Sequence, residues 1–323
     1  MQQVLDLPLV LTPELCQGRV YIVVGANVGL GYEAAKHVVS LGSDKVIMAC
    51  RNVAAGQSAL ATIEAETGKA GIAEVWELDL SSYTSVKAFA SRAISSLSRI
   101  DAVIENAAVA AGSDMRAEGH PLSVTVNVTG TLLLAVLLLP KLMADAARLE
   151  IQPHIAIVTS GAGFSAKEQW LTVADDPIAK MDNLESQVEF LYSGSKLFEV
   201  FAVRHFAPLV PVSKTGVVIN LINPGLCKTE LSRNAPPEFR AKLSQMHAEC
   251  GRTAEQGSRT LLHGAIAGAA SHGCYLDDCE IREFKVPDWV DDEEGKKMQK
   301  WAWEAVAREL ESVEPGCVAR ILE

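Results

Sequence analysis

Short apolar runs alternate with longer stretches of helical periodicity along most of the chain. The runs are rich in β-branched residues and apolar at nearly every position, which is typical of strands that are covered on both faces. They lie at 19–24, 45–50, 73–78, 100–105, 154–160 and 216–222. After each run, apolar residues recur at helical spacing, as in 29–42 and 83–97. Repeated β-α units of this kind predict right-handed crossovers and a parallel sheet, and hence a doubly wound α/β fold of the Rossmann type.

No internal repeat, low-complexity segment or linker interrupts this alternation. We therefore expect one domain with a core at about 19–281, an N-terminal extension and a C-terminal helical tail at 282–323. An amphipathic helix is predicted at 296–310 in the tail, where Trp301 and Trp303 are expected to pack against the body.

Composition and charge limit the kinds of partner. The 323 residues are 49% hydrophobic and 21% charged, as in folded proteins, and the net charge of −11 argues against nucleic acid and anionic lipid. The longest strongly apolar run, at 132–139, is too short to span a bilayer. Its helix is apolar nearly all round, which is compatible with a homodimer interface or with simple burial. Seven scattered cysteines without a C-x-x-C pair favour reduced thiols, no metal site and a cytoplasmic location.

A glycine-rich loop joins the first strand to the first helix. It reads VVGANVGLG, and glycine is needed where backbone turns sharply or approaches a phosphate closely. The N-terminus of the following helix offers N–H groups and a partial positive charge to a pyrophosphate. A plain glycine-rich turn is the alternative, but the position between strand and helix favours dinucleotide binding. The candidate cofactor-binding residues here are Gly25, Asn27, Gly29, Leu30 and Gly31.

Tyr192 and Lys196 lie four residues apart in a predicted helix, so their side chains share one face. This spacing also arises by chance, and its meaning depends on the rest of the chain. With the glycine loop, the pair resembles the short-chain dehydrogenase/reductase branch that carries T-G-x-x-x-G-x-G, although Val24 stands where the threonine is usual. After the fourth strand, 105–108 resembles N-N-A-G, with Glu105 in place of the first asparagine and Ala108 in place of the glycine.

The resemblance implies a set of catalytic and cofactor-binding residues. Tyr192 would exchange a proton with the substrate oxygen, Ser160 would hydrogen-bond that oxygen, Lys196 would hold the nicotinamide ribose, and Asn127 would help hold a water leading from Lys196. A neighbouring ammonium and an oxidised nicotinamide are expected to lower the pKa of the Tyr192 phenol. Tyr192 and Lys196 would also contact the cofactor, as would Asp79, Leu80, Asn106, Ala107, Pro224, Gly225 and Thr229.

The end of the second strand indicates which dinucleotide binds. NAD sites commonly place an acidic residue here, whereas an arginine accommodates a 2′-phosphate. No acid occurs between Val46 and Asn52, and Arg51 follows the strand directly. A guanidinium can pair with the phosphate bidentately, so we expect NADPH/NADP+, the alternative being that Arg51 is merely exposed.

Two variable segments are expected to contact the substrate: the stretch between Ser160 and Tyr192, and a lid region at 226–252. Their apolar residues suggest a bulky hydrophobic carbonyl compound, or equally the packing of these segments onto the body. The candidate substrate residues are Phe164, Trp170, Leu226 and Phe239.

The sequence is similar to fungal members of the family related to retinol dehydrogenases. This similarity suggests reduction of a polyketide-like ketone. The alternatives are oxidation of a lipid or retinoid-like alcohol, a dinucleotide-binding protein without turnover, and a sugar-nucleotide epimerase or dehydratase of the extended branch, which the glycine spacing disfavours.

Overall fold

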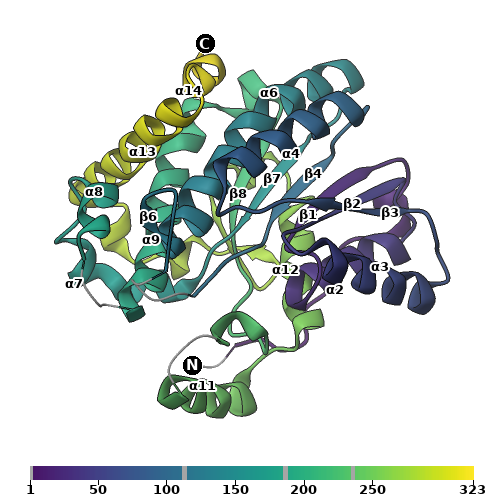
Figure 1. Ribbon diagram of the computed structural model, residues 1–323, viewed down its shortest axis with the longest axis horizontal. Coiled ribbons are helices and arrows are strands. Elements are labelled where there is room, and N and C mark those ends of the chain that lie inside the picture. The colour runs from purple at the N-terminus through teal and green to yellow at the C-terminus, as the bar shows by residue number, and fades with distance from the viewer. Residues whose placement is uncertain (1–2, 111–114, 185–187, 234–236) are drawn as a thin grey trace.

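A central sheet of eight strands organises the computed structural model, which describes residues 3–110, 115–184, 188–233 and 237–323, without the side chains of 188, 189 and 239. The strand order is β3-β2-β1-β4-β7-β8-β9-β10 (Figure 1). All neighbouring strands run parallel except β9 and β10, which confirms the predicted doubly wound α/β fold. The strands are β1 (Val20–Val24), β2 (Lys45–Cys50), β3 (Ala73–Glu77), β4 (Ala102–Glu105), β7 (His154–Val158), β8 (Val218–Asn223), β9 (Tyr275–Asp277) and β10 (Glu280–Ile281).

Helices cover both faces of the sheet, which explains why its strands are apolar throughout. Successive side chains of a strand point to opposite faces. In β1, Ile22 and Val24 enter the cluster formed with α4 (Tyr83–Ser96), α6 (Thr131–Leu149) and α9 (Val188–Leu209). Tyr21 and Val23 enter the opposite cluster, with α2 (Gly29–Ser40), α3 (Val53–Thr67) and α12 (Ala254–Gly264). Neither face of β1 therefore meets water.

The most apolar helix of the described chain runs continuously from Leu122 to Leu149. It comprises α5 (Leu122–Val124), the π-helical turn η1 (Thr125–Gly130) and α6, and it is the one described helix long and apolar enough to cross a membrane. Its most apolar stretch is 94% buried inside the fold. The helices α4 and α14 (Cys317–Leu322) pack against α6, so burial within this chain accounts for the apolar surface without a second copy.

The C-terminal tail forms an outer layer over α9. Its long helix α13 (Glu293–Val313) packs along α9, as the yellow end of the chain in Figure 1 shows. The Trp303 ring stacks on Phe206 of α9 with the ring centroids 4.3 Å apart, and its side chain is buried. Trp301 is partly buried against the same core. The predicted packing role of both tryptophans is confirmed.

The lid region leaves the body beyond β8 and returns before α12. It contains η3 (Glu230–Ser232) and α11 (Pro237–Cys250), and α11 projects from the body near the N-terminus (Figure 1). An isolated parallel β-bridge, formed by the backbones of Cys227 and Arg252, closes the base of the lid. The remaining short elements are α1 (Pro13–Cys16), β5 (Arg116–Ala117), β6 (His120–Pro121), η2 (Gly161–Ala166), α7 (Lys167–Trp170), α8 (Pro177–Asp182), α10 (Val212–Thr215), η4 (Ala269–Ser271), η5 (Glu283–Lys285) and η6 (Asp288–Val290).

Candidate active site

The candidate residues gather at one edge of the sheet because they follow strands that are neighbours. β1, β4, β7 and β8 lie side by side and parallel, so their carboxyl ends meet at the same edge. The glycine loop follows β1, Asn106 follows β4, Ser160 follows β7, and Asn223 ends β8. Ligands of open α/β sheets bind outside the carboxyl ends of the strands.

The glycine loop has the geometry of a cradle for a pyrophosphate. Gly25 and Gly29 have φ values of +75° and +65°, which side chains rarely adopt. A Cβ at Gly31 would lie 2.6 Å from Nδ2 of Asn106, whose amide donates to the Val24 carbonyl at 3.0 Å. The loop therefore needs glycine at all three positions. α2 then begins at Gly29, and Val28 contributes no side-chain hydrogen bond to the first turn of that helix.

The next two strands place the candidates for the adenosine half of a dinucleotide. Arg51 is exposed directly after β2, beside β1. The Asp79 carboxylate accepts from the backbone N–H of Ser81 at 2.9 Å and from its hydroxyl at 2.6 Å, so it shapes its own turn. Leu80 is buried, and its carbonyl lies against Gly130 of η1, where a Cβ would not fit. Of these three residues, Arg51 is therefore the one whose charged group is open to a ligand, whereas Asp79 and Leu80 shape the turn after β3.

Ser160 and Tyr192 are brought together at the end of β7. Ser160 caps η2, accepting from the N–H of Ala162 at 3.2 Å, and its side chain lies beside the Tyr192 phenol. Burial raises the pKa of Tyr192 to about 12, although the hydrogen bond with Ser160 lowers it. The negative charge of Glu199 raises this pKa further. In the chain alone, Tyr192 is therefore held as a neutral phenol.

Lys196 does not lower the pKa of Tyr192 in the chain alone, contrary to the expectation from the sequence. Its ammonium donates to the Val158 carbonyl at 2.8 Å and lies 2.8 Å from Oε2 of Glu199. The side chain is only 2% exposed. Its positive charge is already balanced by the Glu199 carboxylate, which explains why it does not favour the phenolate form of Tyr192.

Asn127 links the loop after β4 to the helix that carries the tyrosine. It lies within η1, fully buried. Its amide oxygen accepts from the N–H of Val109 at 2.9 Å, and its Nδ2 donates to the Val109 carbonyl at 3.0 Å and to the Ser195 hydroxyl at 2.9 Å. These contacts fix the position of α9 relative to the β4 loop. Single-turn π-helices are frequent at functional sites.

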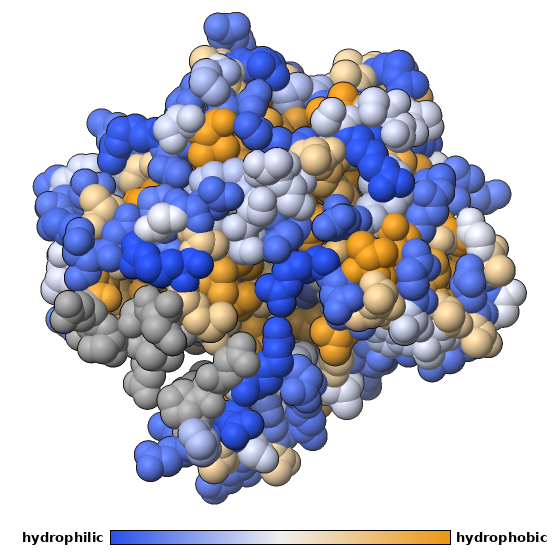
Figure 2. All heavy atoms as spheres, in the orientation of Figure 1, coloured by the Kyte–Doolittle hydropathy of each residue, from blue (hydrophilic) through white to orange (hydrophobic). Residues whose placement is uncertain are grey.

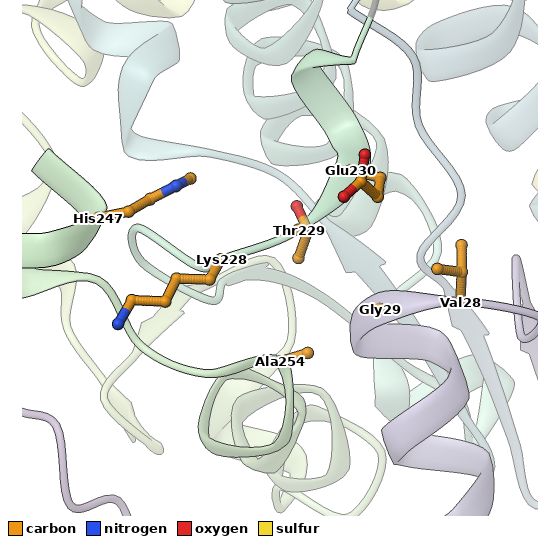
Figure 3. Close-up of a pocket in the computed structure, with 7 residues that line it drawn as sticks. All are labelled: Val28, Gly29, Lys228, Thr229, Glu230, His247 and Ala254. Carbon is orange, nitrogen blue, oxygen red and sulfur yellow. The ribbon is translucent and has the colours of Figure 1, made fainter. Parts of the chain in front are cut away.

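The segment after β8 faces the glycine loop. Oδ1 of Asn223 accepts from the N–H groups of Gly161 at 3.2 Å and Gly225 at 3.3 Å, so one side chain ties the loop after β7 to the Pro224-Gly225 turn. Further on, Thr229 lies against Gly29. A cleft of about 430 Å³ opens between α2 and the lid, as Figure 3 shows. It is lined by Val28, Gly29, Lys228, Thr229, Glu230, His247 and Ala254.

The candidate substrate residues do not form one group. Phe164 follows Ser160 in η2 and packs on Tyr275 with the ring centroids 5.5 Å apart, partly buried. Trp170 is fully buried between Phe198 and Phe201 of α9, so the structure supports the packing alternative and corrects its assignment to a substrate wall. The side chain of Phe239 lies outside the described residues.

The N-terminal segment is hydrogen-bonded to both ends of the lid, a contact that the sequence did not predict. Gln3 donates to the carbonyls of Leu226 at 2.8 Å and Cys250 at 2.5 Å, and its oxygen accepts from the N–H of Leu226 at 3.0 Å. The backbone of the candidate substrate residue Leu226 is therefore fixed by residues far away in the sequence. Glutamine carries no signal for such a role, because only the tertiary fold places it there.

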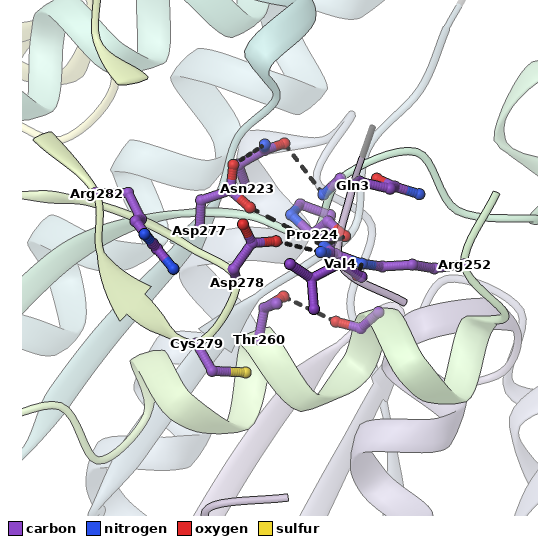
Figure 4. A network of polar contacts seen from close by, with 12 residues as sticks. Gln3, Val4, Asn223, Pro224, Arg252, Thr260, Asp277, Asp278, Cys279 and Arg282 are labelled. Atoms are coloured by element: carbon purple, nitrogen blue, oxygen red, sulfur yellow. Dashed lines mark hydrogen bonds and ion pairs between the residues drawn. The ribbon is translucent and has the colours of Figure 1, made fainter. Parts of the chain in front are cut away.

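Arg252, at the end of the lid, also contacts the N-terminal segment (Figure 4). Its guanidinium is fully buried and donates to the carbonyls of Val4 at 2.8 Å and Pro224 at 2.7 Å, and it also pairs with Asp278. The turn that faces the glycine loop is thus held by an arginine and by the N-terminal segment. A lone arginine in a polar lid gave no indication of this burial.

Comparisons with known proteins agree with this geometry. Residues 19–172 match the short chain dehydrogenase family. The chain is 40% identical over 304 residues to the short chain dehydrogenase/reductase dmxR8 of Cryptosporiopsis sp. (strain 8999), covering 93% of this chain and 92% of that protein. It is 37% identical over 304 residues to the short-chain dehydrogenase/reductase ffsI of Aspergillus flavipes, covering 92% and 87% of the two chains. The chain belongs to the short-chain dehydrogenase/reductase family.

Solved structures share the fold at lower identity. A short chain dehydrogenase from Shigella flexneri 2a str. 301, complexed with NADP, aligns with a TM-score of 0.62 at 20% identity, covering 83% of this chain and 100% of that chain. L-sorbose reductase from Gluconobacter frateurii, complexed with NADPH and L-sorbose, aligns with a TM-score of 0.59 at 18% identity, covering 81% and 95%.

Proposed function

We propose that this chain is an NADPH-dependent ketoreductase that reduces a bulky hydrophobic, polyketide-like ketone. The observation that carries the proposal is the position of Ser160 beside Tyr192, close enough to lower its pKa, at the sheet edge where the glycine loop also lies. Family membership makes the chain an oxidoreductase. The reduction direction, the preference for NADPH and the class of ketone are parts of the proposal.

The residues of the chain divide the reaction between them. A bound nicotinamide supplies a hydride to the carbonyl carbon. Tyr192 donates its phenolic proton to the carbonyl oxygen, and the Ser160 hydroxyl hydrogen-bonds the same oxygen while negative charge develops on it. Asn127 keeps α9 in register with the loop after β4, so that Tyr192 stays at the strand edge. Lys196 lies one turn further along the same helix face, where it would hold the nicotinamide ribose.

The two reaction directions require different protonation states of Tyr192, and the chain alone holds the one that reduction needs. A phenol with a pKa of about 12 keeps its proton at neutral pH, which is the protonation state that reduction requires at the outset. An enzyme that oxidises alcohols at neutral pH needs the phenolate as a base, which burial and Glu199 both disfavour here. The presence of Asn127, Ser160, Tyr192 and Lys196 together argues against a dinucleotide-binding protein without turnover.

The exposed Arg51 supports NADPH as the cofactor. It follows β2 directly, no carboxylate lies in the strand, and a guanidinium can pair bidentately with a 2′-phosphate. Two structural neighbours were solved with NADP or NADPH bound. Apolar surface supports a hydrophobic substrate: Figure 2 shows apolar residues gathered in the hollow at the centre of one face of the molecule.

Replacing Tyr192 by phenylalanine tests the proposed function. The variant Tyr192→Phe removes the proton donor, so we expect NADPH oxidation with a panel of hydrophobic ketones to fall by about 10²–10⁴-fold. NADPH binding, measured by nicotinamide fluorescence, should stay nearly unchanged. Tyr21→Phe is the matched control, because it removes the hydroxyl of a buried tyrosine outside the candidate site, which donates to the Leu15 carbonyl and lies beside the Cys16 thiol. Substantial turnover in Tyr192→Phe would contradict the proposed mechanism.

A further inference from the structure

A buried ion pair and a second buried carboxyl group lie in the layer between the sheet and α9. Glu199 lies on α9, three residues after Lys196, and its Oε2 is 2.8 Å from Nζ. Glu105 is the last residue of β4 and pairs in register with Ile157 of β7. Ile157 and Val103 both point into the layer between the sheet and α9. Because strand side chains alternate, Glu105 points into this layer as well.

All three side chains of this cluster are shielded from water. Glu105, Glu199 and Lys196 are 2%, 1% and 2% exposed. Neither oxygen of Glu105 has a hydrogen-bond partner among the described residues, although buried polar groups are nearly always satisfied. An isolated buried carboxylate would be very costly, and a neutral carboxyl group much less so. The charge state of Glu105 therefore depends on what lies beside it.

Among the described residues, Lys196 is the one cation that lowers the pKa of Glu199, and no cation lowers that of Glu105. Lys196 and Tyr192 face Glu199 from its own helix, the Thr159 hydroxyl lies beside Glu199, and Cys227 lies near Tyr192. Burial raises the pKa of Glu199 to about 7, although Lys196 and Thr159 lower it. Burial, followed by the negative charge of Glu199, raises the pKa of Glu105 well above its ordinary value. Two carboxyl groups that share a site cannot both ionise easily.

We propose that Glu105 and Glu199 share one proton, and that this carboxyl pair holds the Lys196 ammonium in place within an electrically neutral cluster. One ammonium, one carboxylate and one neutral carboxyl group sum to zero net charge, which is the state that burial favours. Both glutamates are positioning residues, because they act through Lys196. Any effect of the two glutamates on turnover rests on the proposed function, in which Lys196 holds the nicotinamide ribose. The shared proton itself does not depend on that function.

Infrared spectroscopy of the full chain tests the shared proton. At about pH 8, where an ordinary glutamate is ionised, the wild type should show the carbonyl-stretch band of a protonated carboxyl group. The band should be lost in Glu105→Gln and also in Glu199→Gln, because each variant leaves one carboxyl group for one ammonium. Glu77→Gln is the matched control: Glu77 is likewise the last residue of a strand of the same sheet, β3, but it is exposed, so the band should persist.

The pH dependence of unfolding provides a second readout that does not require Glu199→Gln to fold. The pKa of Glu105 is raised in the folded chain, so the folded chain keeps a proton that the unfolded chain releases. Stability is therefore lost as pH rises above about 4.5, the unfolded value, toward the raised value. Glu105→Gln has nearly the same shape as the protonated glutamate and does not ionise. The ratio of the unfolding equilibrium constants, wild type over Glu105→Gln, should therefore increase with pH, by at most about tenfold per pH unit.

Any of three results would overturn the proposal. The first is a wild type without the protonated band at this pH, and the second is a band that persists in Glu105→Gln or in a folded Glu199→Gln. A stability gap between the wild type and Glu105→Gln that does not change with pH would overturn it as well. None of these measurements involves turnover, so failure here is distinct from failure of the ketoreductase proposal.

Discussion

At the scale of single residues, the structure shows that the same side chain acts differently according to its neighbours. A tyrosine and a lysine one helical turn apart suggest a lysine that favours the phenolate. In the folded chain the Lys196 ammonium instead pairs with Glu199, and burial keeps the Tyr192 phenol neutral. The sequence names both residues, but the charge that reaches Tyr192 depends on Glu199, which the motif does not include.

Arg51 carries a prediction at this scale. Arg51→Asp replaces a partner of the 2′-phosphate by a charge that repels it. A hydrogen bond to a charged group contributes about 1.5–3 kcal/mol, so NADPH affinity should fall by about tenfold to a hundredfold. NADH affinity should change little or rise. Comparing both dissociation constants with those of Arg51→Met separates lost attraction from added repulsion. An unchanged preference in Arg51→Asp would remove Arg51 from the cofactor site.

At the scale of elements, the two ends of the chain stabilise parts of the fold that are remote in sequence. The N-terminal segment holds both ends of the lid through Gln3, and Arg252 ties that segment to the turn after β8. The C-terminal helix α13 covers α9, whose opposite face contacts the sheet. α9 carries Tyr192 and Lys196, so packing of the tail helps to hold the helix of the candidate catalytic residues.

Trp303 tests the contribution of the tail. Trp303→Ala removes a buried ring that stacks on Phe206, so we expect a loss of about 3–5 kcal/mol in the free energy of unfolding. Trp301→Ala is the matched control, because that ring is only partly buried and lies under Lys297. Denaturant titration followed by circular dichroism measures both variants. Equal losses in the two variants would show that the stacking of Trp303 on Phe206 adds no more to the free energy of unfolding than the partly buried Trp301 ring does.

At the scale of the whole molecule, cofactor binding should stabilise the fold, because the candidate site draws on loops after several neighbouring strands. NADPH at one hundred times its dissociation constant should add about 2.7 kcal/mol to the free energy of unfolding, visible as a rise in melting temperature. NADH at the same concentration should give a smaller rise, as Arg51 predicts. A larger rise with NADH would favour alcohol oxidation, and no rise with either would favour a protein without a working cofactor site.

Much of the fold and the candidate site follows from local patterns. Uniformly apolar runs predicted the parallel strands because both faces of β1 are covered. Motifs at strand ends predicted a common site because neighbouring parallel strands end at one edge. Trp170 was harder to assign, since an aromatic residue in a variable loop can line a substrate cleft or fill a core, and only the neighbours Phe198 and Phe201 decide.

The sequence by itself determined the alternation of strands and helices, the positions that must be glycine, and the identity of the residues that can donate a proton. These are local properties, set by backbone freedom, periodicity and side-chain chemistry. Only the tertiary structure decided that Gln3 and Arg252 close the base of the lid, and that Glu105 of β4 is buried in the layer that holds the Lys196–Glu199 pair of α9. Such contacts join residues distant in sequence, and their strength depends on burial, which no local pattern specifies.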